Sequence, residues 1–385
     1  MPIRAWPKNA PGQEEKKLPE KMQPFTRYVV LITVSRIEAE KIGAITVMKQ
    51  RLFRVSMVLS AGGAIAAAVL SGTQAASAAT SHAPSWHPVL SVPGGGVTEA
   101  VVATGKTTGW AFLANGAAYQ RVGATAWKKV AFPGHSGHVN AAAASSPSNV
   151  WAAFQPAAGG SQVDRWNGKK WAVVKSFPGA VTNLSVLGPN DVWAFGGASG
   201  SEGVFHFNGH SWAKVASTLG GGSATSDLNV WAFSGTQLAH YDGRKWTATN
   251  VVGLFPTSSG SPVTPVLTGV LALAPNNVFA TGVGWAGVGG GAAVVLHFNG
   301  HGWSRAAAGP IVINSAVTLA SDGRGGLWMT SDTHENHQVL LHYSAGKLVD
   351  AGEAFMSVAS IPGTAEALGG NAAPVATAPV VYQYS

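Results

Sequence analysis

The segment Asp332–His337 reads DTHENH and gathers oxygen and nitrogen donors within a few residues. Its members Asp332, His334, Glu335 and His337 are residue types that bind divalent metals such as zinc or manganese. They are therefore the candidate metal ligands of this sequence, and no other cofactor is expected. The alternative interpretation is a polar loop whose side chains are simply solvated.

Four other histidines precede an aromatic residue at the same place in successive segments: His206, His240, His297 and His342. An equivalent position in each repeated unit implies a shared structural role, so we expect these side chains to pack within the fold rather than to bind metal. His210 and His301 lie in turns and should be solvated.

Irregular segments supply the candidate ligand-binding residues. Trp285 lies in the glycine-rich stretch 282–291, outside the repeated tryptophan positions, where it could stack on a sugar ring or close its own loop. His135 and His138 lie in another connection. Function in rigid repeat folds tends to be carried by loops, so the predicted ligand-binding set is Trp285, His135, His138, His334, Glu335 and His337.

Short repeated strands must position these residues. In Asn190–Ala216 an apolar run over Asp191–Phe195 ends at two glycines, and a second strand covers Val204–Phe207. A third strand follows Asn208-Gly209, the pair favoured in a type I′ hairpin turn, where both central residues have positive φ. Trp193 and Phe195 alternate along their strand and should share one face. Similar apolar strands recur at Trp110, Trp151, Trp231, Phe279 and Trp328.

The spacing of these units predicts an all-β fold, a β-propeller of seven four-stranded blades. Units of about 40–50 residues with four short strands are typical of propeller blades. The segment Pro88–Val92 has no partners of its own, and the last unit stops after a third strand near Tyr382–Ser385. The N-terminal strand should therefore complete the last blade and close the ring. Six blades are the fallback, because the last unit is weak.

The pattern of Asp191–Gly197, Val204–Phe207 and Trp212 resembles the kelch repeat, and the resemblance extends over about residues 85–385. It implies a secreted bacterial propeller like the central domain of galactose oxidase. That enzyme's cofactor joins a tyrosine to a cysteine, and this chain has no cysteine, so a non-catalytic member is implied. Separately, Ser321–Trp328 is similar to the Asp-containing turn of sialidase-type propellers, in which Asp322 would stabilise the turn.

Other enzyme classes lack their residues. Sialidases grip a carboxylate with clustered arginines, but the five arginines beyond residue 78 lie mostly at repeated strand or turn positions: Arg121, Arg165, Arg244, Arg305 and Arg324. Acidic residues there number 12, too few and too often in turns to nominate the paired carboxylates of a glycosidase. No strand–turn–helix nucleophile motif is present.

The first part of the chain predicts export. Residues 48–78 have a basic start, an apolar run over Ser56–Leu70 and a small-residue cleavage motif, with cleavage between Ala78 and Ala79. The apolar run is shorter than the roughly 20 residues that span a bilayer, so no membrane span is expected after cleavage. Residues 1–47 precede this complete signal peptide and are interpreted as a mis-assigned or disordered extension. The propeller domain is then 79–385.

The basic charge resides mostly in the leader. Residues 1–78 contain 11 of the 25 Lys and Arg and 5 of the 17 Asp and Glu. Residues 79–385 therefore contain 14 basic and 12 acidic side chains. No cationic footprint for nucleic acid remains.

The resulting hypothesis is a secreted, monomeric, non-catalytic scaffold that binds a glycan or an extracellular protein through loops on one rim. The alternative is an extracellular lyase or hydrolase that uses the His/Glu loop residues with a divalent metal.

Overall fold

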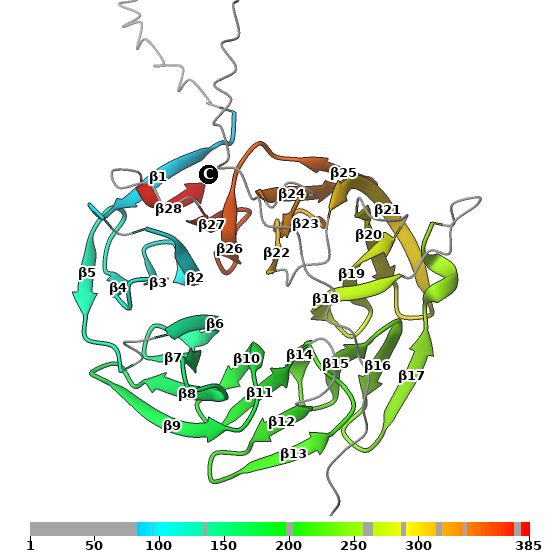
Figure 1. Cartoon of the computed structure of the whole chain (residues 1–385), viewed down its shortest axis with the longest axis horizontal. Coiled ribbons are helices and arrows are strands. Elements are labelled where there is room, and N and C mark those ends of the chain that lie inside the picture. Colours follow the sequence, from blue (N-terminus) through cyan, green and yellow to red (C-terminus); the bar gives the residue numbers. More distant parts are fainter. Residues whose placement is uncertain are drawn as a thin grey trace, which may run out of the picture. The chain divides into compact units, whose positions relative to one another are not determined.

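The computed structural model describes residues 83–94, 96–133, 137–197, 203–256, 265–285, 290–312, 318–333, 337–372 and 379–385. These residues form seven four-stranded antiparallel sheets arranged as blades around a ring (Figure 1). The prediction of an all-β propeller with seven blades is confirmed. Among the described residues, no helix is long and apolar enough to cross a membrane.

Each blade runs from its innermost to its outermost strand. The first three blades comprise β2 (Thr98–Gly105), β3 (Thr108–Leu113), β4 (Ala118–Arg121) and β5 (Trp127–Val130); β6 (Gly137–Ser146), β7 (Asn149–Pro156), β8 (Ser161–Trp166) and β9 (Trp171–Phe177); and β10 (Val181–Gly188), β11 (Asp191–Gly196), β12 (Val204–Phe207) and β13 (Trp212–Ala216).

The next three blades comprise β14 (Gly222–Ser226), β15 (Asn229–Ser234), β16 (Gln237–Tyr241) and β17 (Trp246–Asn250); β18 (Val266–Ala274), β19 (Asn277–Trp285), β20 (Gly291–Phe298) and β21 (Trp303–Val312); and β22 (Leu319–Ser321), β23 (Leu327–Asp332), β24 (Gln338–Ser344) and β25 (Lys347–Asp350). A 3-10 turn, η1 (Val252–Leu254), lies between β17 and β18.

The seventh blade is built from both ends of the described chain. It comprises β26 (Phe355–Ser360), β27 (Ala367–Asn371), β28 (Pro379–Tyr384) and β1 (Trp86–Ser91), in that order outward. Trp86 pairs with Tyr384, and its ring contacts Phe355 edge-on at a centroid distance of 4.8 Å. The predicted closure by the N-terminal strand is confirmed, and it covers the edge of β28 that would otherwise be open to pairing.

Alternation along the second strand of each blade joins neighbouring blades. In β11, Trp193 and Phe195 pack in one apolar cluster with Val230 of the fourth blade. Val192 of the same strand packs in another cluster with Trp151 of the second blade. The aromatic residues therefore share one face, as predicted, and each blade buries both faces against its neighbours.

Hydrogen bonds between innermost strands also link the blades. The Ser357 hydroxyl accepts the Val101 backbone N–H at 2.9 Å, and the Ser223 hydroxyl accepts that of Ala272 at 3.1 Å. In the same way, the Ser185 hydroxyl accepts the Ala224 N–H, and the Thr318 hydroxyl accepts the Val358 N–H. Buried backbone donors need such partners, so short hydroxyl side chains at these positions fix adjacent blades in register.

The predicted type I′ turn at Asn208-Gly209 is wrong. Gly209 has φ near +90°, but Ala345 is the one non-glycine residue with positive φ in the described ranges. The Asn208 N–H donates to the Ser211 carbonyl, so the central residues are Gly209 and His210. The Asn208 side chain accepts the N–H groups of His210 and Ser211, both at 3.0 Å. This side-chain bonding places asparagine before the turn rather than inside it.

Candidate functional site

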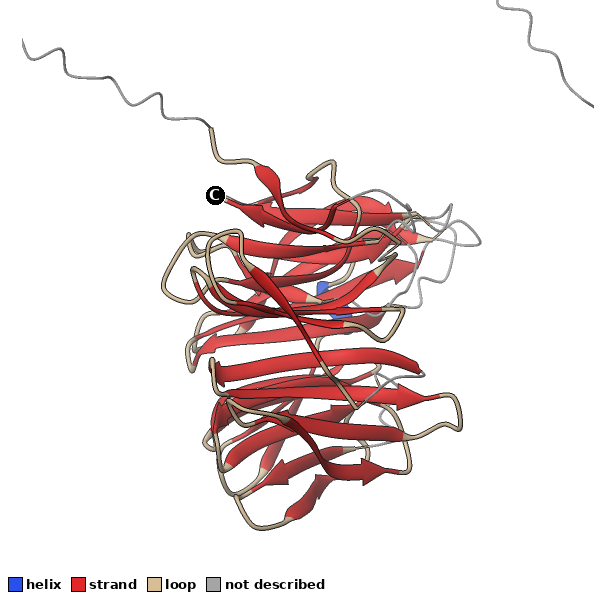
Figure 2. Cartoon of the chain, turned by 90° about the vertical axis from the view of Figure 1, so that its left-hand side faces the viewer, coloured by secondary structure: helices blue, strands red, loops and turns tan. Residues whose placement is uncertain are grey.

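The antiparallel blades have two unlike rims. Connections from the second to the third strand of a blade, and from its fourth strand to the next blade, lie on one rim, which we call the long-loop rim. The remaining connections form the opposite, tight-turn rim. Figure 2 shows the strands running between these two rims. The predicted ligand-binding residues belong to connections or strand ends of the long-loop rim.

Several predicted residues lie outside the described part of the chain. These are His135, His334 and Glu335, as well as Ala78 and Ala79 at the proposed cleavage point. Trp285 is described as the last residue of β19, where its backbone pairs with Gly291, but its side chain is not described. The predicted metal group of Asp332, His334, Glu335 and His337 therefore stays a prediction.

The described ends of the 332–337 segment are bonded to their own strands. The Gln338 side-chain amide donates to the Asp332 carboxylate, and the Thr333 N–H donates to the His337 carbonyl at 2.8 Å. The Thr333 hydroxyl also accepts the His337 N–H at 3.3 Å. These bonds hold the base of the β23–β24 connection on the long-loop rim.

His138 lies near the start of β6 and contacts an acidic residue of the first blade. Its Nδ1 bonds Glu99 Oε1, while Glu99 Oε2 accepts the Val139 N–H at 2.8 Å. The Glu99 side chain is 9% exposed and the His138 side chain 75% exposed. The pair thus presents an imidazole to solvent on a carboxylate that is fixed within the ring. Sequence reasoning found His138 but missed Glu99, because their contact joins two blades.

A polar cavity opens beside this pair, lined by the first residues of several innermost strands. Its volume is about 130 Å³, and its polar lining residues are Glu99, Asn140, Thr182, Asn183, Thr318 and Ser357. Pockets that enclose a small molecule usually measure about 300–1,000 Å³. This cavity therefore suits one side chain or sugar hydroxyls of a larger ligand resting on the rim. We call it the channel mouth.

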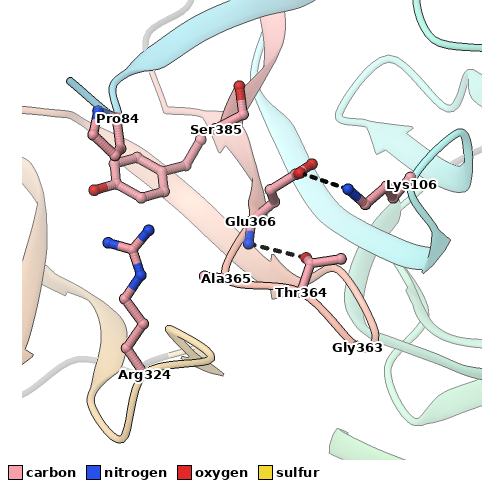
Figure 3. A pocket seen from close by; sticks show the side chains of 9 residues that line it. Pro84, Lys106, Arg324, Gly363, Thr364, Ala365, Glu366 and Ser385 are labelled. Atoms are coloured by element: carbon pink, nitrogen blue, oxygen red, sulfur yellow. Dashed lines mark hydrogen bonds and ion pairs between the residues drawn. The ribbon is translucent and has the colours of Figure 1, made fainter. Parts of the chain in front are cut away.

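A second pocket lies on the tight-turn rim where the ring closes, with a volume of about 370 Å³. Figure 3 shows Lys106 and Arg324 reaching into it from different sides, with Lys106 paired to Glu366. The Nζ–Oε1 distance is 3.2 Å, and Glu366 Oε2 accepts from the Gln383 amide at 2.8 Å. The carboxylate is thus already bonded from two blades.

Arg121 extends this network into the interior. It is almost fully buried and donates to Gln383 Oε1 at 2.7 Å and to two carbonyls of its own turn. Burial lowers the pKa of Arg121, while the Glu366 charge raises it. The network therefore links blades one and seven through hydrogen bonds from a buried, charged side chain.

The four equivalent histidines stack on the second strand of their blades. The His342 ring lies 3.8 Å from that of Trp328, and His206, His240 and His297 stack on Trp193, Trp231 and Phe279 at 4.3–4.7 Å. Each Nε2 bonds a side-chain oxygen on the same blade at 2.9–3.0 Å. Burial lowers the pKa of His240 and His297. Their packing is the repeated arrangement expected of structural residues.

The predicted turn stabilised by the Asp322 side chain is confirmed. One carboxylate oxygen accepts the N–H groups of Arg324 and Gly326 at 2.8 and 2.7 Å, and the other bonds His342.

The similarity to known proteins lies in the fold. No family model matches the chain, and no curated protein matches it in sequence. YCF48 bound to a D1 peptide is 11% identical, with a TM-score of 0.51, over 78% of this chain and 96% of that one. The WD40 propeller of Doa1 is 11% identical, with a TM-score of 0.54, over 78% of this chain and 97% of that one. A GH74 xyloglucanase from Xanthomonas campestris is 14% identical, with a TM-score of 0.50, over 78% of this chain and 53% of that chain. These likenesses establish a seven-bladed β-propeller and leave its function to be inferred from its own surface.

Proposed function

We propose that this chain is a secreted, kelch-like, non-catalytic propeller that binds an extracellular protein or glycan through the long-loop rim. The channel mouth carries this proposal. Polar side chains from five blades converge there on a cavity too small to enclose a substrate, next to the exposed imidazole of His138. Hydrogen-bonding groups held by rigid strands can select a ligand without undergoing a costly rearrangement.

The binding surface is preorganised by the ring itself. Glu99 is held by the Val139 N–H and His138, and Asn140 donates its amide to Gln155 at 3.0 Å. A solved propeller of similar fold is bound to a peptide, which supports a peptide segment as one form of ligand. Trp285 and the His135, His334, Glu335 and His337 positions would extend the contact along the same rim.

Cellular placement belongs to the same proposal. The segment 48–78 would direct export, with cleavage between Ala78 and Ala79, and the mature protein would act outside the cell as a monomer. Nucleic acid is not a proposed partner, because the residues beyond the leader are nearly neutral.

The proposal is tested by measuring binding to glycan and peptide arrays. Glu99→Gln keeps an acceptor for the Val139 N–H but removes the charge beside His138, and Asn183→Ala removes one polar group of the mouth. Both variants should weaken the binding of any ligand that wild type retains. His210→Ala, on the exposed tight-turn rim, is the matched control and should bind normally.

Binding that is equal in wild type, Glu99→Gln and Asn183→Ala would place the ligand elsewhere. Metal-dependent cleavage of a polysaccharide, lost in His334→Ala, would instead establish the alternative lyase or hydrolase. That outcome would end the non-catalytic proposal.

A further inference from the structure

In the histidine row, His206 of the third blade and His342 of the sixth bond a carboxylate, and only the third blade's histidine in the described row has a second carboxylate within ion-pair distance. In the fourth and fifth blades the histidine bonds a neutral amide, Asn229 or Asn277. In the third blade His206 bonds Asp191 at the start of β11, and Asp227, in the β14–β15 turn of the fourth blade, joins the group. One imidazole and two carboxylates from two blades therefore meet on the tight-turn rim.

The distances within this group suit a metal. His206 Nε2 lies 3.0 Å from Asp191 Oδ1 and 3.3 Å from Asp227 Oδ1, and one ligand atom of each residue lies within 4.8 Å of the other two. Metal–ligand bonds of about 2.0–2.2 Å separate neighbouring ligand atoms by about 2.8–3.1 Å in octahedral sites and about 3.3–3.6 Å in tetrahedral sites. An ion could thus bind with little movement of the three side chains.

Two of the three side chains are carboxylates, so the group favours binding of a cation. Two carboxylates this close repel each other unless a positive charge lies between them. The side chains of Asp191 and Asp227 are 34% and 53% exposed, so an ion and its remaining water ligands can enter from solvent.

Trp193 orients two of the three side chains. Its ring stacks on His206 at 4.3 Å, and its indole N–H donates to Asp227 Oδ1 at 3.1 Å. In the second and fourth blades the equivalent indole donates to the asparagine of its own strand instead. The bond from the Trp193 indole holds Asp227 toward the imidazole. Hydrogen bonds of this kind to the metal ligands strengthen metal sites.

We propose that Asp191, His206 and Asp227 form a binding site for a divalent transition metal, such as Zn²⁺ or Mn²⁺, that ties the third blade to the fourth. The imidazole favours these ions over Ca²⁺, which prefers all-oxygen sites. The site lies on the rim opposite the proposed ligand surface and does not depend on it.

The test is metal titration of the chelator-treated full chain with Zn²⁺ and with Mn²⁺, followed by calorimetry and by thermal unfolding. Wild type should bind at this site and show a raised melting temperature. Asp227→Asn and Asp191→Asn should each weaken binding by about tenfold or more, since even outer-shell changes cost 10–100-fold. Asp191→Asn reproduces the Asn229–His240 pair of the next blade, so it should fold normally.

Asp242→Asn is the matched control, because it replaces an exposed acid on the same rim with the residue that Asn208 supplies in the third blade. It should bind metal as wild type does. Co²⁺ absorption reports directly on imidazole ligation and should be lost in His206→Gln. The proposal is overturned if wild type neither binds nor is stabilised. It is also overturned if binding survives in both Asp191→Asn and Asp227→Asn, or is lost only in His334→Ala and His337→Ala.

Discussion

Replacing Trp86 with alanine should weaken the closure of the ring. The Trp86 ring contacts Phe355, Trp328 and Tyr384 at centroid distances of 4.8–5.4 Å. A fully buried aromatic side chain removes about 150–250 Å² from water, which corresponds to about 4–6 kcal/mol. Trp86 is partly exposed, so we expect Trp86→Ala to lower the free energy of unfolding by about 3 kcal/mol.

The measurement is urea unfolding followed by circular dichroism, together with calorimetry. For a domain of this size the melting temperature should fall by about 5 °C. His87→Ala, on the same strand and exposed, is the control and should change stability by less than about 0.5 kcal/mol. If the two variants are equally stable, the packing of β1 does not hold the ring closed, and the reasoning fails.

Three other substitutions test the packing and the titration of the blades. Gly222→Ala should cost about 1–3 kcal/mol, because a Cβ there would lie 2.2 Å from the Phe195 ring and 2.5 Å from the Trp231 carbonyl. Gly253→Ala, which meets nothing within 4 Å, should unfold at the wild-type urea concentration; a similar loss in both would contradict the packing argument. Burial lowers the pKa of His240 in the folded protein. The neutral imidazole therefore adds to the free energy of unfolding at pH values above the unfolded-state pKa of about 6.5, and this stability is lost as the pH falls below it. His240→Gln, the residue type at this place in the first and seventh blades, should therefore show a shallower loss of stability between about pH 6.5 and 5. An unchanged slope in urea unfolding across that range would refute the assignment.

The repeated strands could be predicted because their signals are local. Trp193 and Phe195 alternate within one strand, and the spacing of such strands sets the number of blades. Even the unusual seventh blade followed from an unpaired first strand and an incomplete last unit. The predicted type I′ turn was wrong because Asn-Gly can lie either at the centre of a turn or with the asparagine just before the centre. The hydrogen bonds accepted by the asparagine side chain decide between these two geometries.

The surface chemistry could be predicted only in part. His138 was identified by residue type, but its partner Glu99 is contributed by a different blade. Asp191 and Asp227 likewise carry no motif, since their meeting depends on how the third blade packs against the fourth. Contacts between blades follow from the rotation of one sheet relative to the next, and no spacing along the chain encodes them.

The pairing of β1 with β28 has a consequence for how the molecule is made. Six blades can form from contiguous sequence as the chain emerges, but the seventh needs the first strand and the last together. Joining segments about 300 residues apart in a free chain costs about 5 kcal/mol of loop-closure entropy. The already formed blades reduce this cost by bringing the two ends near each other. Ring closure should therefore be the final folding step, and β28 stays an open edge until it occurs.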